Sequence, residues 1–198
     1  IDASDEIDAS DETDEADATD EADATDEAAA TAPVYAGQGD DAAAVDRVDG
    51  MRPGLGLCEG AVTGMADGYG RMADRPAATL LHLGPGLANG LANLHNARRA
   101  ATPIVNIVGD HATYHAQYDA PLASDIVGFA RPVSGWVHSS TSAGSVAADG
   151  ARAVRAARSA PGQIASLIVP ADVAWLDAGT PADPLPVEAP APVSSAAV

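Results

Sequence analysis

Short apolar runs alternate with Ala- and Gly-rich segments between residues 54 and 176, and this alternation limits the possible folds more than any other feature. We predict strands at residues 55–58, 77–82, 104–108, 132–137 and 163–169. We predict helices at residues 60–72, 87–99 and 145–158. Strands that alternate with helices of about a dozen residues are typical of a parallel sheet covered on both faces. The predicted fold class is therefore α/β, with a parallel sheet and helices on both faces.

Both ends of the chain differ in composition from this central segment. Residues 1–27 form a near-repeat that holds 14 of the 29 acidic residues and no basic residue. Such dense like charge predicts a disordered tail, and a calcium-binding loop is disfavoured because it needs a central glycine. The sequence from residue 177 onward is rich in Ala and Pro and has no period, as in a linker. We predict an acidic low-complexity tail at 1–41, a folded domain at 42–176 that opens on a short helix, and a linker at 177–198.

Charge and cysteine usage exclude several classes of function. The net charge is −19, but residues 28–198 hold 15 acidic and 10 basic residues, a difference of −5. No basic cluster indicates a nucleic-acid partner. Cys58 is the only cysteine, which excludes an intramolecular disulfide and fits a reducing cytoplasm, so we expect a cytoplasmic protein. No apolar run is long enough to cross a membrane, and no signal peptide is visible.

Two features fall where an apolar run gives way to a helix. Glu59 follows the first run, and the glycine turn of residues 84–86 follows the second. In an open α/β sheet such points lie together at the carboxyl edge, where ligands bind. A buried Glu is costly without a partner, whereas a helix N-terminus favours its charge. Glu59 is thus either a site residue or an ordinary first-turn Glu.

Other motifs are weaker. Gly84, Gly86 and Gly90 approach the dinucleotide pattern G-x-G-x-x-G, but the third glycine comes one residue too late. His111 and His115 are four residues apart, which suits a metal only on a helix, and the local sequence favours a polar loop. No G-x-S-x-G motif supports a serine hydrolase. Cys58 has no activating neighbour, so we predict a small core residue and no metal site.

Several linked motifs resemble thiamine-diphosphate-dependent enzymes. Residues 59–71, EGAVTGMADGYGR, resemble the family pattern E-x-x-A-x-x-x-A-x-G-Y-A-R, with Gly70 at the last alanine. Residues 84–97, GPGLANGLANLHNA, resemble the segment G-P-G-x-x-N, and residues 103–109, PIVNIVG, resemble a following strand. The resemblance runs from about residue 42 to 176 and is strongest to acetolactate-synthase-like proteins. It implies the N-terminal pyrimidine-binding domain of that family.

The resemblance also implies roles for single residues. Glu59 matches the glutamate that hydrogen-bonds the N1′ nitrogen of the cofactor's aminopyrimidine. This contact favours the imino form, which removes the thiazolium C2 proton before attack on a 2-keto acid such as pyruvate. His82 falls where some keto-acid decarboxylases carry a catalytic histidine, although a structural histidine at a strand end is the alternative. The wall beside the cofactor would be formed by Gly84, Pro85, Gly86 and Asn89.

Thiamine diphosphate in this family is bound between two domains. Its diphosphate is held through Mg²⁺ by a GDG…N motif in a C-terminal domain, often of another subunit, so the resemblance implies a homo-oligomer such as a homodimer. The sequence leaves FAD binding open, because a middle domain would hold it. The family's first strand should precede Ala42, where the acidic repeat and the stretch VYAGQGDD stand, so we expect an edge of the sheet to be missing or badly replaced.

The sequence also has no GDG motif, which in the family belongs to the C-terminal domain. From these two departures from the family pattern we expect a fragment of a carboligase or decarboxylase that is inactive alone. The alternatives are a non-catalytic or split-subunit domain with a separate diphosphate-binding partner, or an interaction protein that acts through its acidic tail.

Overall fold

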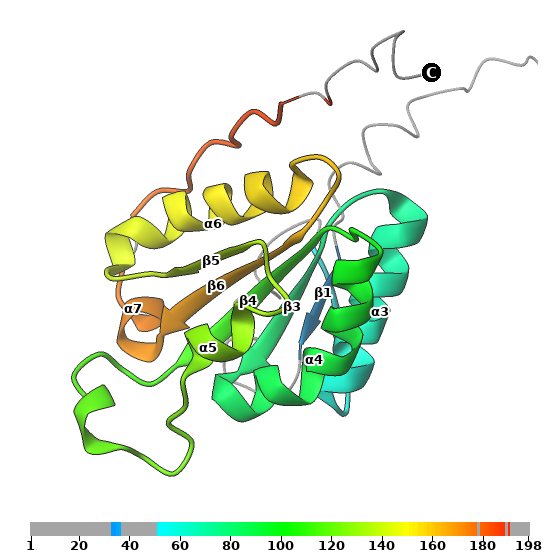
Figure 1. Ribbon diagram of the computed structural model, residues 1–198. Coiled ribbons are helices and arrows are strands. Elements are labelled where there is room, and N and C mark those ends of the chain that lie inside the picture. Colours follow the sequence, from blue (N-terminus) through cyan, green and yellow to red (C-terminus); the bar gives the residue numbers. More distant parts are fainter. Residues whose placement is uncertain (1–32, 37–50, 178, 189, 191–198) are drawn as a thin grey trace, which may run out of the picture.

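Six parallel strands form one sheet in the order β2-β1-β3-β4-β6-β5, with helices on both faces (Figure 1). The computed structural model describes residues 33–36, 51–177, 179–188 and 190. The strands are β1 (Pro33–Ala36), β2 (Arg52–Leu55), β3 (Ala77–His82), β4 (Ile104–Asp110), β5 (Trp136–Ser139) and β6 (Ile164–Pro170). The helices are α3 (Glu59–Ala73), α4 (Leu83–Arg99), the 3₁₀ turn η1 (Ala116–Tyr118), α5 (Ile126–Ala130), α6 (Ala143–Arg158) and α7 (Ala171–Trp175). The predicted α/β class is confirmed.

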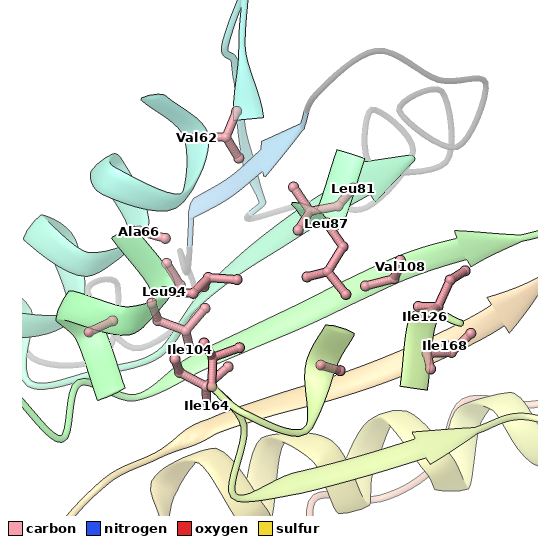
Figure 2. Close-up of a cluster of buried hydrophobic side chains, with 14 residues drawn as sticks. Val62, Ala66, Leu81, Leu87, Leu94, Ile104, Val108, Ile126, Ile164 and Ile168 are labelled. Atoms are coloured by element: carbon pink, nitrogen blue, oxygen red, sulfur yellow. The ribbon is translucent and has the colours of Figure 1, made fainter. Parts of the chain in front are cut away.

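The two faces of the sheet bury separate apolar clusters. On the face covered by α3, α4 and α5, the cluster includes Leu81, Leu94, Ile104 and Ile168, as Figure 2 shows. The opposite face, covered by α6 and α7, buries a smaller cluster that includes Leu167. Every residue of β6 is buried, as expected for an inner parallel strand with helices on both sides.

The observed elements differ from the predicted ones mainly at their ends. Helix α4 begins at Leu83, four residues earlier than predicted, so the glycine turn forms the first turn of the helix. Leu83 has a left-handed backbone, with φ of 57°, which lets β3 pass into α4 without a loop and costs about 1–2 kcal/mol. Strand β2 overlaps the predicted range 55–58 only at residue 55, and β5 overlaps the predicted range 132–137 only at residues 136 and 137. Helices α5 and α7 were not predicted, because five residues are too few to show a helical period.

The first strand, which we predicted to be missing or badly replaced, is present as β1. It lies between β2 and β3 and pairs in parallel with both. The prediction was wrong because β1 has only four residues and lies within the range 1–41 that we assigned to the tail. The sheet therefore begins before the predicted boundary at 42. The acidic repeat and the predicted helix at 42–48 lie outside the described residues.

A row of polar side chains crosses the core and was not predicted. Thr79 Oγ1 donates to Asn106 Oδ1 over 2.6 Å, and Asn106 Nδ2 donates to Ser166 Oγ over 3.2 Å. These three residues lie side by side on β3, β4 and β6, and all are fully buried. Ser134 extends the row, since its hydroxyl lies 2.8 Å from that of Ser166. The row satisfies its own polar groups, as buried groups require.

A buried carboxylate, also not predicted, joins β5 to α6. The side chain of Asp149 is fully buried, accepts a 2.8 Å hydrogen bond from Ser140 Oγ and pairs with Arg152. His138 Nε2 lies 3.2 Å from the same carboxylate. Burial acts to raise the pKa of Asp149, but the hydrogen bonds from serine hydroxyls and the nearby His138 and Arg152 outweigh it and lower the pKa.

Among the described residues, no helix is both long and apolar enough to cross a membrane.

Candidate functional site

Glu59 is the first residue of α3 and lies at the carboxyl edge of the sheet, half-buried. Asn89 Nδ2 donates a 3.2 Å hydrogen bond to Glu59 Oε2. Glu59 Oε1 has no hydrogen-bond partner among the described residues, and it lies 3.6 Å from where a Cβ on Gly86 would stand. The side chain of Glu59 stands at the N-terminus of α3, where backbone N–H groups point toward it. One carboxylate oxygen is thus held by the protein, and the other faces the glycine turn.

Close packing of α3 against α4 fixes the position of Glu59. Thr63 Oγ1 lies 2.9 Å from the carbonyl oxygen of Glu59 and 3.1 Å from that of Gly90, so its hydroxyl links the two helices. Asn93 Nδ2 donates to the carbonyl oxygen of Gly60 over 2.6 Å. A Cβ at Gly90 would stand only 2.8 Å from Thr63 Cγ2. The late third glycine of the dinucleotide-like pattern therefore serves helix packing.

A small cavity adjoins His82 at the same edge. His82 is exposed, ends β3 and pairs in register with Gly109 of β4. The cavity has a volume of about 90 Å³, and its lining includes His82, Leu83, Asp110 and Trp175. Trp175 was not predicted, and Asp110 was not assigned to this edge, although its place at the end of the most regular strand was an available signal.

The structure brings together some of the predicted site residues and separates others. Gly86 lies between Glu59 and His82, because a Cβ there would be 3.6 Å from Glu59 Oε1 and from His82 Cβ. Asn89 contacts Glu59 directly. Pro85 is exposed in the first turn of α4. Gly84 instead packs against Ser124, since a Cβ at Gly84 would stand 2.2 Å from Ser124 Cβ. Gly84 therefore anchors the loop after β4 rather than facing Glu59.

The loop after β4 is hydrogen-bonded to α7. Asp172 accepts a 2.9 Å hydrogen bond from the backbone N–H of Thr113 and a 2.5 Å hydrogen bond from its hydroxyl. These hydrogen bonds from Thr113 lower the pKa of Asp172. In the same loop the rings of His111 and His115 lie 5.5 Å apart. The described residues contain no group of three or more His, Cys, Asp or Glu that could hold a metal ion.

Cys58 is exposed, so the prediction of a small core residue is wrong. It is the N-cap residue of α3, with an extended backbone, and its side chain makes no capping hydrogen bond. The reason is that β2 ends at Leu55, so the chain leaves the sheet before it reaches Cys58. The thiol thus lies beside the candidate site rather than in the core.

Comparisons with known proteins identify relatives of this chain in sequence and in fold. Residues 40–130 match the family described as thiamine pyrophosphate enzyme, N-terminal TPP binding domain. The chain is 60% identical over 147 residues, 74% of its length, to the "Putative acetolactate synthase large subunit IlvX" of Mycobacterium tuberculosis. It is 35% identical over 119 residues, 60% of its length, to benzoylformate decarboxylase of Pseudomonas aeruginosa.

A solved structure shares the fold. The thiamine diphosphate-dependent 4-hydroxybenzoylformate decarboxylase of Rhodococcus jostii RHA1 matches with a TM-score of 0.72 and 25% identity, over 83% of this chain and 32% of that one. The present chain spans 28% of the length of the M. tuberculosis relative and 22% of that of the P. aeruginosa enzyme. Sheet, motifs and matches together show that the chain belongs to the thiamine-diphosphate-dependent enzymes, as an acetolactate-synthase-like N-terminal pyrimidine-binding domain.

Proposed function

We propose that this domain supplies the pyrimidine-binding half of a thiamine diphosphate site, and that Glu59 is the residue that activates the cofactor. The observation that carries the proposal is the state of the Glu59 carboxylate. Asn89 holds one oxygen, and the other has no partner among the described residues. A half-buried carboxylate at a helix N-terminus, with one oxygen open, can accept a hydrogen bond from a protonated ring nitrogen of an aminopyrimidine.

The residues around Glu59 fit a flat ring. Gly86 has no side chain, and a Cβ there would stand in van der Waals contact with Glu59 Oε1. The absence of that side chain leaves the open oxygen accessible from the glycine turn. We therefore assign Gly86 and Asn89 to the wall beside the pyrimidine, and we extend this wall to Pro85 on the exposed first turn of α4. Gly84 supports the wall indirectly through its contact with Ser124.

Bound thiamine diphosphate supplies a carbon nucleophile and an electron sink for the decarboxylation and carboligation of 2-keto acids. In our proposal Glu59 exchanges a proton with the pyrimidine ring nitrogen, and the packing of α3 on α4 keeps the carboxylate in place. His82, exposed beside the small cavity, transfers a proton at the substrate. The similarity to an acetolactate-synthase-like relative supports pyruvate or another 2-keto acid as the substrate.

A second domain must complete the site. The 198 residues contain no GDG sequence, the start of the motif by which the family holds Mg²⁺ and the diphosphate. We propose that a diphosphate-binding domain, in the same longer polypeptide or in a partner subunit of a homo-oligomer, supplies these contacts. The 198-residue chain by itself should then bind the pyrimidine weakly and catalyse nothing.

Titration of the ¹⁵N-labelled chain with thiamine, which lacks the diphosphate, tests the proposal. We expect amide shift changes at Glu59, Gly86 and Asn89, and at least a tenfold loss of affinity in Glu59→Gln. Glu188→Gln is the matched control, because Glu188 is exposed and far from this edge. Shift changes elsewhere, or equal affinity of Glu59→Gln and the wild type, would contradict the role of Glu59.

An activity assay tests the need for a second domain separately. The purified chain is incubated with pyruvate, thiamine diphosphate and Mg²⁺, and acetolactate is measured over time. We expect no product above the protein-free control. Steady formation of acetolactate would contradict the need for a second domain while leaving the role of Glu59 intact.

A further inference from the structure

The three long helices all have arginine in their last turn, at the edge of the sheet opposite the candidate site. In parallel βαβ units the helices run antiparallel to the strands, so their C-termini lie at the amino edge. Helix α3 has Arg71 in its last turn, α4 has Arg98 and Arg99, and α6 has Arg155 and Arg158. We call these five residues the arginine rim.

Most of the rim is not neutralised by the folded domain. Arg71 forms a salt bridge with Asp67 at 2.8 Å. Among the described residues, the other four arginines form no salt bridge, and all four side chains are exposed. Arginines in a last turn also stabilise the helix dipole, but this local role leaves most of their charge facing water.

Hollows in the surface connect the parts of the rim. Arg71 and Arg99 border one hollow, together with Asp67 and Ala100. Arg158 borders a second, of about 390 Å³, whose lining includes Asp74 and the neighbouring Ala101. Arg155 borders a third, of about 610 Å³, which contains Glu188 and shares Ala160, Val187 and Pro190 with the second. The hollows lie along the amino edge from α3 to α6, and an extended segment there would face the arginines of the rim and these three carboxylates.

The most acidic part of the chain is tethered beside this rim. Val34 pairs with Ala78, which sets Pro33 next to the start of β3 and close to Pro76, a lining residue of the second hollow. Only residues 28–32 separate Pro33 from residues 1–27, and five residues span at most about 18 Å. Residues 1–27 hold 14 acidic residues and no basic residue. The two charge patterns are thus opposite in sign and close along the chain.

We propose that residues 1–27 bind the arginine rim of the same molecule by electrostatic attraction. Single exposed ion pairs are weak, but the tether raises the effective concentration of the acidic segment to the millimolar range. Many carboxylates can also exchange among the same few guanidinium groups, so no single geometry is needed. Salt must weaken the contact, because all the charges concerned are exposed.

A spin label on the acidic segment tests this contact in the full chain. Cys58→Ser removes the single thiol, and Ser10→Cys introduces one for a nitroxide label. At 20 mM NaCl we expect at least twofold broadening of the amide signals of Ala100, Ser159 and Gly162 by the nitroxide. The signal of Gly109, at the opposite edge, should be unaffected. In 500 mM NaCl the broadening should disappear.

Matched variants separate charge from folding. In the first variant, Gln replaces the four unpaired arginines, which should abolish the broadening, whereas Lys at the same positions should preserve it. In the second, Asn and Gln replace the acidic residues of 1–27, which leaves the folded domain unchanged and should also abolish the broadening. This second variant keeps the test decisive if the first does not fold.

Three results would overturn the proposal. The first is equal broadening at both edges of the sheet, and the second is broadening that persists after neutralisation of the acidic segment. The third comes from a mixture of ¹⁵N-labelled chains without a spin label and unlabelled chains with one. Broadening of the same strength in this mixture would show contact between molecules instead of within one.

Discussion

Replacement of Gly90 by Ala tests how α3 is held against α4. A Cβ at Gly90 would stand 2.8 Å from Thr63 Cγ2, whereas carbon atoms in good contact are 3.5–4.0 Å apart. Thr63 cannot rotate freely, because its hydroxyl binds the carbonyl oxygens of Glu59 and Gly90. The helices must therefore separate by somewhat less than about 1 Å, which would move Glu59 relative to Asn89.

The magnitude follows from two opposing terms. Overpacking costs about 1–3 kcal/mol, and the better helix propensity of Ala returns about 1 kcal/mol. We expect Gly90→Ala to lower the free energy of unfolding by about 0–2 kcal/mol. In a Thr63→Ser background the obstructing methyl is absent and the nearest remaining atoms are 3.5 Å away or more. There the same replacement should raise the free energy of unfolding by up to about 1 kcal/mol.

Urea unfolding of the four proteins of this double-mutant cycle, followed by circular dichroism, measures both effects. Gly68→Ala is the control, because a Cβ on this exposed α3 residue would meet no atom within 4 Å. It should stabilise the domain by about 0.5–1 kcal/mol in either background. The reasoning is refuted if Gly90→Ala has the same effect with Thr63 as with Ser at that position.

Three further predictions concern two buried polar groups and the hydrogen bonds between Asp172 and Thr113. Asn106→Leu should lower the free energy of unfolding by about 1–3 kcal/mol, because Thr79 loses its acceptor, and Thr79→Val should restore part of this loss in a denaturation assay. The pKa of Asp149 is lowered in the folded protein, so its charge stabilises the fold above the pKa of the unfolded state, and this stabilisation is lost as the pH falls through the folded pKa. Asp149→Asn should therefore flatten the acid side of the Tm–pH curve. An unchanged slope would contradict this. Asp172→Asn should speed hydrogen exchange at the Thr113 amide, measured by NMR, while exchange in β6 stays unchanged.

The sequence predicts the layers of this fold better than its edges. Strands such as β4 and β6 are continuous apolar runs, so their type and approximate bounds follow from hydrophobicity. The short strand β1 has no such signal, because four residues are too few for a recognisable apolar run. It is defined only by its pairing with β2 and β3. The start of α4 was missed for a related reason, since a left-handed leucine at position 83 has no recognisable sequence signature.

The candidate site, too, could be predicted from the sequence only in part. Glu59 could be found from its place after an apolar run and from the linked motifs around it. The contact of Asn89 with Glu59 and the role of Gly90 depend on how two helices cross, which the local sequence does not determine. Asp149 and Asn106 resemble surface residues in sequence and are buried only because serine, threonine or arginine partners meet them from other elements.

The strand order has a consequence for the order of folding. Strands β3, β4, β6 and β5 come from residues 77–170 and are neighbours in space, so they can pair before residues 33–55 take part. Strand β1 must then add to the free edge of β3 and β2 to the free edge of β1, so their contacts form late. Destabilising changes in β1 and β2 should therefore accelerate unfolding and leave the refolding rate almost unchanged. Strands β1 and β2, on one side of the sheet, would thus control the lifetime of the folded state. Strands β3, β4, β6 and β5 would control the rate at which it forms.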